Sequence, residues 1–251
     1  MKQKDYSLDM YEEICKALKV HNVVTVEQYI SKGTNNPIII LRHDVDREHM
    51  NALAMAELEH SYGINSTYYF RYPPNSKIIY AINKLGHEIG YHYEVLDKAK
   101  GDYEKALNIF EQELADFRKY SSVKTICMHG NPLTNWDGRD LWKYHDYKKF
   151  DLLGEAYLSC TDIPIYLTDT GRNWKGQNNV KDKFGTENRN PGLKKTAELI
   201  DYLNKNLQES LYINCHPERW SPGFWAWHRA LVRDNFYNFC KRVLRNLNNK
   251  I

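Results

Sequence analysis

Apolar and polar positions along this chain follow two patterns, one typical of buried strands and the other typical of amphipathic helices. The continuous apolar run at 38–41 predicts a strand that is buried on both faces, as in a parallel sheet. Helical patterns at 48–62 and 103–120 alternate with strand-like segments at 64–70 and 123–128, which predicts βαβ units. Further strands are expected at 87–92, 156–158, 165–168 and 211–215, and further helices at 8–19, 23–31, 78–85, 193–207 and 224–247.

The number of predicted strands bears on the architecture. Seven or so parallel strands within 251 residues fit a closed or nearly closed barrel with outer helices better than an open sheet. No internal repeat or linker divides the chain, so we expect residues 1–251 to form one α/β domain. Residues 131–192 show no regular pattern, and irregular segments of that length in compact domains are often functional.

Charge and cysteine content argue against several classes of function. The 35 basic and 32 acidic residues give a net charge of +3, which is too balanced to indicate a nucleic-acid partner. The five cysteines are widely spaced and form no CxxC pair, so neither a disulfide framework nor a cysteine zinc site is expected. The chain has no apolar leader and no apolar run of membrane length, which predicts a cytoplasmic protein without a membrane span.

The most informative motif directly follows the first buried strand and contains Asp44 and Asp46 between two arginines, Arg42 and Arg47. Ligands bind at the carboxyl ends of parallel strands, where one acid can hold a cation and the other can take a proton from water. Capping of the next helix by Asp46, with ion pairs to the arginines, is the structural alternative. That alternative does not explain the second acid, so we favour the functional interpretation.

Other predicted strands also end in polar residues. His92 and His216 each follow a strand; a neutral imidazole is a good ligand for zinc, and a histidine can also protonate a leaving group. His129 ends another strand, and Asp169 and Arg172 end a fourth. Each of these residues alone is compatible with a structural role, but together they predict a shared polar centre.

With these motifs the sequence resembles the polysaccharide deacetylase family, the NodB-homology or carbohydrate esterase 4 group, from about residue 37 to 220. The resemblance implies a distorted (β/α)7 barrel and a divalent metal, often zinc, that serves to deacetylate N-acetyl amino sugars. It matches Asp44 to the family's catalytic base and Asp46 to a metal ligand. The Gly-His-Glu-Ile-Gly phrase at 86–90 leads to His92, which matches a ligand histidine, and His216 matches the general acid.

The same resemblance assigns roles around the general acid. Asp169, followed by Arg172 and Trp174, resembles the segment that orients it, so we expect Asp169 and Arg172 to serve catalysis. Either Arg42 or Arg172 is expected to keep Asp44 ionised. A carbohydrate substrate is expected to contact Arg42, Trp174 and Trp220.

Two departures from the family pattern concern the metal. The second ligand histidine should lie four residues after His92, but that position is Leu96. Glu94 and His129 are the two candidates for the third ligand, since Glu94 is near in sequence and His129 ends a neighbouring strand. The family's Arg-Pro-Pro-Tyr-like motif is also replaced, by the sequence at 129–132.

The predicted reaction is hydrolysis of an acetamide. Water made acidic by the metal gives its proton to Asp44 and attacks the carbonyl group, and His216 protonates the departing amine. Two alternatives stay open because of the missing histidine. One is a metal-free hydrolase of another C–N bond on the same barrel, and the other is a non-catalytic carbohydrate-binding protein.

Overall fold

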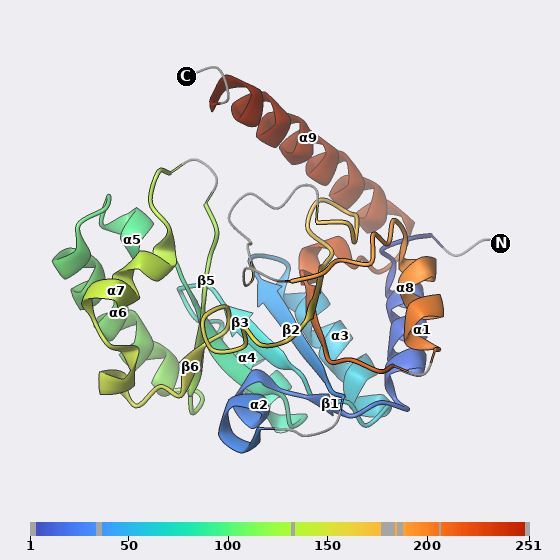
Figure 1. Ribbon diagram of the computed structural model, residues 1–251, viewed down its shortest axis with the longest axis horizontal. Coiled ribbons are helices and arrows are strands. Elements are labelled where there is room, and N and C mark those ends of the chain that lie inside the picture. Colours follow the sequence, from blue (N-terminus) through green and yellow to red (C-terminus); the bar gives the residue numbers. More distant parts are fainter. Residues whose placement is uncertain are drawn as a thin grey trace.

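The sheet organises the whole molecule. A computed structural model describes residues 4–33, 37–131, 134–176, 184, 188–205 and 207–248, with the backbone alone from residue 240 onward. Within these residues one curled, parallel sheet has the strand order β6-β5-β4-β3-β2-β8-β7, and β1 pairs with the start of β2 (Figure 1). The strands are β1 (Val23–Val24), β2 (Ile39–Val45), β3 (Thr67–Phe70), β4 (Glu88–Tyr93), β5 (Thr125–Met128), β6 (Gly154–Glu155), β7 (Ile165–Thr168) and β8 (Leu211–Cys215).

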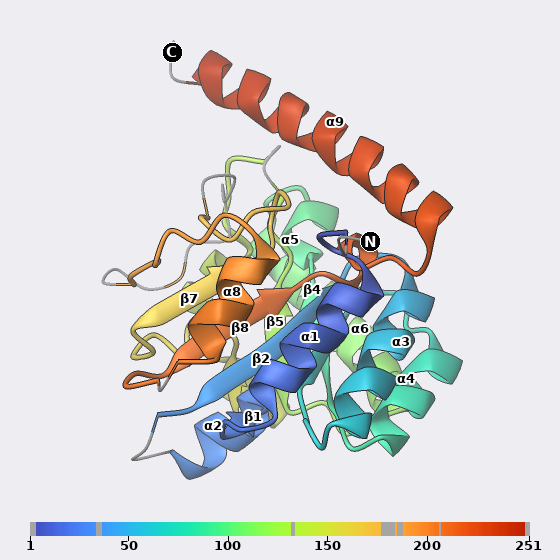
Figure 2. The same cartoon turned by 90° about the vertical axis from the view of Figure 1, so that its right-hand side faces the viewer.

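Helices cover the outside of this sheet. Figure 2 shows α1 and α8 side by side over β2 and β8, while α9 lies across the top of the molecule. In the described part of the chain, no helix is both long enough and apolar enough to cross a membrane. The α-helices are α1 (Leu8–Leu18), α2 (Val26–Lys32), α3 (His49–Ser61), α4 (Ser76–Lys84), α5 (Val95–Lys98), α6 (Tyr103–Arg118), α7 (Leu141–Tyr144), α8 (Thr196–Leu203) and α9 (Phe224–Asn248), and the 3-10 turns are η1 (Gly138–Asp140), η2 (Tyr147–Phe150) and η3 (Pro217–Arg219).

Strand β2 is apolar throughout its first half because both of its faces are buried. Ile39 and Leu41 pack in a core with α1 and α8. Ile40 belongs to the other core, which includes side chains of α4 and α6. Successive side chains of a strand point to opposite faces, so a strand between two cores needs apolar residues at consecutive positions. The prediction of a curled parallel sheet that is covered on its outside by helices is confirmed.

The interior of the curl is polar and aromatic. The buried guanidinium of Arg42 lies 4.2 Å from the ring centroid of Tyr157 and donates hydrogen bonds to the hydroxyls of Tyr212 and Tyr166. Phe184 stacks on Tyr166 at 4.9 Å and meets Tyr212 edge-on at 5.0 Å. No ladder joins β6 to β7 among the described residues. Packed rings, rather than backbone hydrogen bonds, therefore fill the side of the barrel between these two strands.

Close packing explains why the last residue of the Gly-His-Glu-Ile-Gly motif at 86–90, Gly90, is a glycine. A Cβ atom at this position would lie 2.2 Å from Cε1 of Tyr69, whose ring crosses the barrel interior. The Tyr69 hydroxyl is 2.8 Å from the Thr125 hydroxyl, so the ring is held on both neighbouring strands. Only glycine leaves room for this ring, because the close contact is with a buried side chain that cannot move aside.

Three expected elements differ from the structure. Residues 23–31 are not one helix: Val23 and Val24 pair with β2, and α2 begins only at Val26. The strand expected at 156–158 is instead β6, Gly154–Glu155, because residues 157–159 turn back and the Glu155 carboxylate accepts hydrogen bonds from the backbone of Tyr157 and Leu158. The irregular section 131–192 contains α7 and two 3-10 turns as well as the expected β7.

Candidate functional site

Polar side chains from several strands gather at the carboxyl edge of the sheet. Asp44 on β2 pairs in register with Tyr69 on β3, and His92 on β4 pairs with Cys127 on β5. Residues that pair in neighbouring parallel strands point to the same face, so Asp44 and His92 both face the barrel interior. Four more residues directly follow strand ends on this edge: Asp46 after β2, His129 after β5, Asp169 after β7 and His216 after β8.

Asp46 lies between two histidines. Its Oδ1 atom is 3.5 Å from Nε2 of His92 and 3.5 Å from Nε2 of His129, and the two imidazole rings are nearly perpendicular. This carboxylate oxygen is buried and makes no hydrogen bond. A buried carboxylate oxygen without a hydrogen bond is costly, and its position facing two imidazole nitrogens is typical of a cation site.

The His92 ring is oriented by the backbone. Its Nδ1 atom lies 3.0 Å from the carbonyl oxygen of Cys127, to which it donates a hydrogen bond. The other ring nitrogen, Nε2, faces Asp46 and carries the lone pair in the neutral ring. This tautomer is the one that a metal-binding histidine needs. Burial would lower the pKa of His92, but Asp44 and Asp46 raise it overall.

Glu94 lies behind His129 rather than beside Asp46. Its Oε2 atom is 3.5 Å from Nδ1 of His129, and the carboxylate is held by a short ion pair with Arg71 and by Lys98 at 3.6 Å. Burial lowers the pKa of His129, which favours the neutral, metal-binding form of the imidazole. Of the two candidates for the third ligand, His129 therefore faces Asp46, and Glu94 is placed to orient it.

Asp46 Oδ1 faces His92 and His129 at the separation typical of two ligands on one zinc ion. Ligand atoms about 2.0–2.1 Å from zinc lie about 3.3–3.4 Å from one another, close to both distances measured from Asp46 Oδ1. Among the described residues, the group whose three ligand atoms all lie within 4.8 Å of one another is Asp44, His92 and Cys127. We favour the set with Asp46, because the Asp44 carboxylate already has several hydrogen-bond partners and Asp46 Oδ1 has none.

Only one carboxylate oxygen of Asp44 accepts hydrogen bonds from nitrogen donors. Its Oδ2 atom accepts hydrogen bonds from Arg42 at 3.3 Å and from Asn214 at 2.9 Å, while the Cys127 thiol lies 3.7 Å from Oδ1. Burial alone would raise the pKa of Asp44, but the charges of Arg42, His92 and His216 together outweigh burial and lower the pKa below its usual value. The structure therefore presents an ionised carboxylate whose Oδ1 atom meets only a weak donor.

His216 and Asp169 form a tightly bonded pair. The His216 Nδ1 atom lies 2.7 Å from Asp169 Oδ1, and the His216 backbone amide donates to Oδ2 at 2.9 Å. Arg219 and Trp220 also donate to Asp169, each at 2.9 Å. Burial and Arg219 would lower the pKa of His216, but Asp169 raises it overall. His216 is near enough to Asp44 for its charge to contribute to the lowered pKa of that carboxyl group.

The structure corrects three expectations about arginine and tryptophan. Arg172 points away from Asp44 and pairs with Asp234 on α9 at 2.6 Å, so Arg42 alone is the arginine in contact with Asp44. The side chains of Trp174, Trp220 and Arg42 are completely buried, and they present no surface to a substrate. Their physical role is support, since Trp220 bonds Asp169 and Arg42 bonds Asp44.

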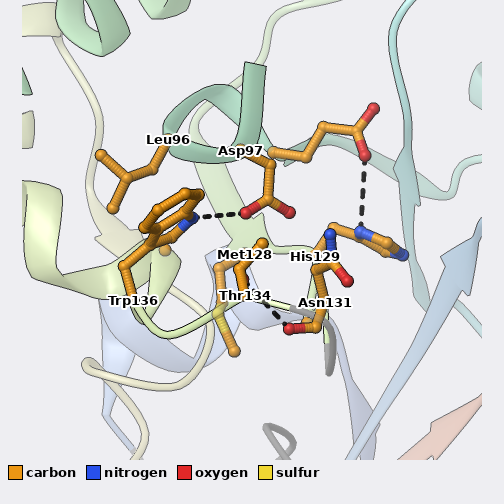
Figure 3. Close-up of a pocket in the computed structure, with 10 residues that line it drawn as sticks. Leu96, Asp97, Met128, His129, Asn131, Thr134 and Trp136 are labelled. Atoms are coloured by element: carbon orange, nitrogen blue, oxygen red, sulfur yellow. Dashed lines mark hydrogen bonds and ion pairs between the residues drawn. The ribbon is translucent and has the colours of Figure 1, made fainter. Parts of the chain in front are cut away.

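A small pocket lies beside His129, between α5 and the segment that follows β5. Figure 3 shows Leu96, Met128 and Trp136 on its apolar side, with Trp136 bonded to Asp97. Leu96 occupies the position where the family pattern has a histidine, and here it lines the pocket. The site thus combines a polar centre with an adjacent partly apolar hollow.

Two residues that contact the acids were not predicted from the sequence. Asn214 on β8 binds Asp44, and its position two residues before His216 was a signal, because alternate residues of an extended segment share a face. Arg219 binds Asp169, but nothing local in the sequence indicates that this side chain turns back toward β7.

Comparisons with known proteins find relatives only among solved structures. No family model and no curated protein matches the chain. The catalytic domain of a peptidoglycan N-acetylglucosamine deacetylase from Eubacterium rectale matches at 13% identity and a TM-score of 0.46, over 83% of this chain and 86% of that chain. A second peptidoglycan N-acetylglucosamine deacetylase matches at 14% identity and a TM-score of 0.43, over 85% and 90% of the two chains.

A third match is a mutant of a CE4 family pseudoenzyme with restored enzymatic activity. Its identity is 10% and its TM-score is 0.39, over 81% of this chain and 63% of that chain. This third match is described as a member of the CE4 family, the group that the motifs resemble.

Proposed function

We propose that this protein is a divalent-metal-dependent hydrolase that removes the acetyl group from an N-acetylated sugar. The observation that carries the proposal is the unpartnered, buried Oδ1 atom of Asp46, at 3.5 Å from Nε2 of both His92 and His129. The carboxylate of Asp44 and the His216–Asp169 pair supply a base and an acid at the same edge of the sheet. The substrate class follows from the motif resemblance.

Asp46, His92 and His129 would hold the ion, and Glu94 would fix the ring of His129 through its Nδ1 atom. When bound, a zinc ion supplies a Lewis acid that polarises a carbonyl oxygen and makes water more acidic. A carboxylate behind a ligand histidine increases the basicity of the ring and holds its orientation.

Asp44 acts as the general base. Its Oδ2 atom is bound by Arg42 and Asn214, so Oδ1 takes the proton of the attacking water. Arg42 keeps the carboxylate ionised, because a neighbouring positive charge favours the charged form of an acid. The water oxygen forms a bond with the acetamide carbon as the proton moves to Asp44.

His216 acts as the general acid. Asp169 accepts a hydrogen bond from Nδ1 and raises the pKa of the ring, so the second proton, on Nε2, is held more tightly than in a free imidazole. The bond between the carbonyl carbon and nitrogen breaks as Nε2 donates this proton to the nitrogen. The products are acetate and a free amino sugar, which accounts for every atom of the amide and the water.

Zinc affinity tests the ligand set. We expect Glu94→Gln to weaken zinc binding by about 10–100-fold, because Glu94 would only orient the ring of His129. We expect His129→Ala to weaken it further, because His129 would contact the ion. Isothermal titration of the chelator-treated protein with zinc chloride measures both constants, and His60→Ala, an exposed histidine on α3, is the control. Equal affinities for the wild type and His129→Ala would contradict the assignment.

Turnover tests the function itself. The zinc-loaded protein should release acetate from N-acetylglucosamine oligosaccharides, and the chelator-treated protein should not. Metal-independent release of ammonia or an amine from another C–N substrate would favour a metal-free hydrolase. Sugar binding without any release would favour a non-catalytic carbohydrate-binding protein.

A further inference from the structure

Helix α9 rests on the carboxyl edge of the barrel through one of its faces. Asp234 pairs with Arg172 at 2.6 Å, and Asn238 donates to the backbone oxygen of Gly171 at 3.1 Å. Arg47, which follows Asp46, donates to the hydroxyl of Tyr237 on the same helix. These contacts place α9 over the edge of the sheet that carries the candidate site.

The opposite face of α9 carries an exposed apolar stripe. Trp225, Val232, Phe236 and Phe239 are 78%, 69%, 63% and 59% exposed, respectively. Their spacings of seven, four and three residues place them within about 60° of one another around a helix of 3.6 residues per turn. The four side chains therefore share one side of the helix, with His228 and Arg229 between Trp225 and Val232, and this side points away from the face that holds Asp234.

Exposed apolar residues elsewhere are not arranged in this way. Tyr80 on α4 and Tyr144 on α7 are as exposed, but they lie singly on separate elements. Single exposed apolar side chains are normal, whereas contiguous patches mark interaction surfaces. In both Figure 1 and Figure 2 α9 lies outside the barrel, and the four side chains of the stripe are exposed, so the stripe is accessible to a large planar partner.

The charge of α9 selects among possible partners. Five basic residues and one acidic residue, Asp234, lie within 224–248. Asp234 is paired with Arg172 and Arg233 is paired with Glu48, and the other four basic residues still give this segment a positive sequence charge. A second copy of this helix would bring like charges together, which opposes self-association. An anionic lipid surface is attracted to the same charges, and aromatic rings such as Trp225 favour the boundary between head groups and acyl chains.

We propose that α9 docks this protein on an anionic membrane surface, with the stripe of Trp225, Val232, Phe236 and Phe239 buried among the head groups. The helix lies in the plane of the surface and does not span it. Docking in this orientation holds the carboxyl edge of the barrel next to the membrane. The inference is independent of the proposed hydrolysis, because it concerns binding to lipid and needs no turnover.

Co-sedimentation with lipid vesicles tests the proposal. The full-length protein should bind vesicles of phosphatidylcholine mixed with phosphatidylserine, and should bind pure phosphatidylcholine vesicles much more weakly. Raising the salt concentration should weaken binding to the anionic vesicles, because salt screens surface charges. No binding to anionic vesicles at low salt would overturn the proposal.

Variants separate the stripe from simple charge attraction. The triple variant Trp225→Ser/Phe236→Ser/Phe239→Ser should bind more than about tenfold more weakly, because it lacks the apolar area that the bilayer buries. Arg229→Gln should weaken binding about fivefold, the change expected for one basic residue near an anionic surface. The control Tyr80→Ser/Tyr144→Ser removes exposed rings away from α9 and should bind like the wild type.

Two further results would also overturn the proposal. Unchanged binding by the triple variant, with full salt sensitivity, would show that the stripe is not buried in lipid. A dimer in sedimentation-velocity runs that the triple variant abolishes would show that a second copy covers the stripe. Thermal unfolding of each variant is compared with the wild type, and the exposed positions of these side chains predict unchanged midpoints.

Discussion

Replacing Asp44 with asparagine is expected to lower the rate of acetate release by about 10²–10⁴-fold, the contribution typical of a general base. The amide of asparagine has nearly the same shape as the carboxylate, so contacts with Arg42 and Asn214 can persist while the proton acceptor is lost. Zinc affinity should stay close to that of the wild type, since Asp44 lies outside the proposed ligand set.

Asp46→Asn is the matched control for this experiment. This variant should lose both zinc affinity and turnover, because Asp46 Oδ1 is the atom that faces His92 and His129. Acetate release is measured for both variants at saturating zinc, together with the zinc titration. An Asp44→Asn protein that keeps most of its activity, or that loses zinc as Asp46→Asn does, would refute the division of labour between the two acids.

Replacing Glu59 with glutamine is expected to destabilise the protein by about 3–5 kcal/mol, the usual cost of breaking a buried ion pair. Glu59 lies near the end of α3 and is completely buried, with His43 at 2.7 Å. Its carboxylate also accepts hydrogen bonds from Ser66 at 2.5 Å, from Tyr68 at 3.0 Å and from Tyr11. A glutamine side chain would turn an NH₂ group toward hydroxyls that already donate, so some of these groups would lose their partners.

The pH dependence of stability should change as well. Burial alone would raise the pKa of Glu59, but His43 and the hydrogen bonds lower it to about 2 from 4.5. The unfolded state therefore binds more protons than the folded state between these values. Glu59 contributes about 3 kcal/mol of stability above pH 4.5, and this contribution is lost as the pH falls toward 2.

Urea unfolding of the wild type and Glu59→Gln, at neutral pH and in steps below pH 4.5, measures both effects. The difference in the free energy of unfolding between the wild type and Glu59→Gln should decrease as the pH falls. Glu57→Gln, an exposed neighbour on the same helix, should change stability by less than about 0.5 kcal/mol. A difference in the free energy of unfolding that is the same at all pH values would show that Glu59 is not ionised in the folded protein.

Local pattern was enough to predict much of the architecture. The apolar run before Asp44 and the helical segments that follow it identify a parallel sheet, because a strand buried on both faces must be apolar at consecutive positions. Short elements were missed where local pattern is weak. The two-residue β1 is defined by its pairing with β2, and β6 is displaced from the expected segment by the turn that Glu155 caps.

Like the fold, the candidate site could be predicted only in part from local sequence. Local sequence places Asp44, Asp46, His92, His129 and His216 at strand ends, because polar residues directly follow apolar runs. Which of these side chains face one another depends on the order and register of strands far apart in the chain, and no local pattern carries that information.

The sequence by itself therefore determined the class of fold and the set of polar residues at the carboxyl edge, through periodicity and motif spacing. Tertiary structure alone decided that His129 faces Asp46 while Glu94 lies behind it, and that Arg42 rather than Arg172 contacts Asp44. It also decided that Trp174 and Trp220 are buried. The physical reason is that these contacts join separate strands and loops, whose relative positions are set by packing of the whole sheet.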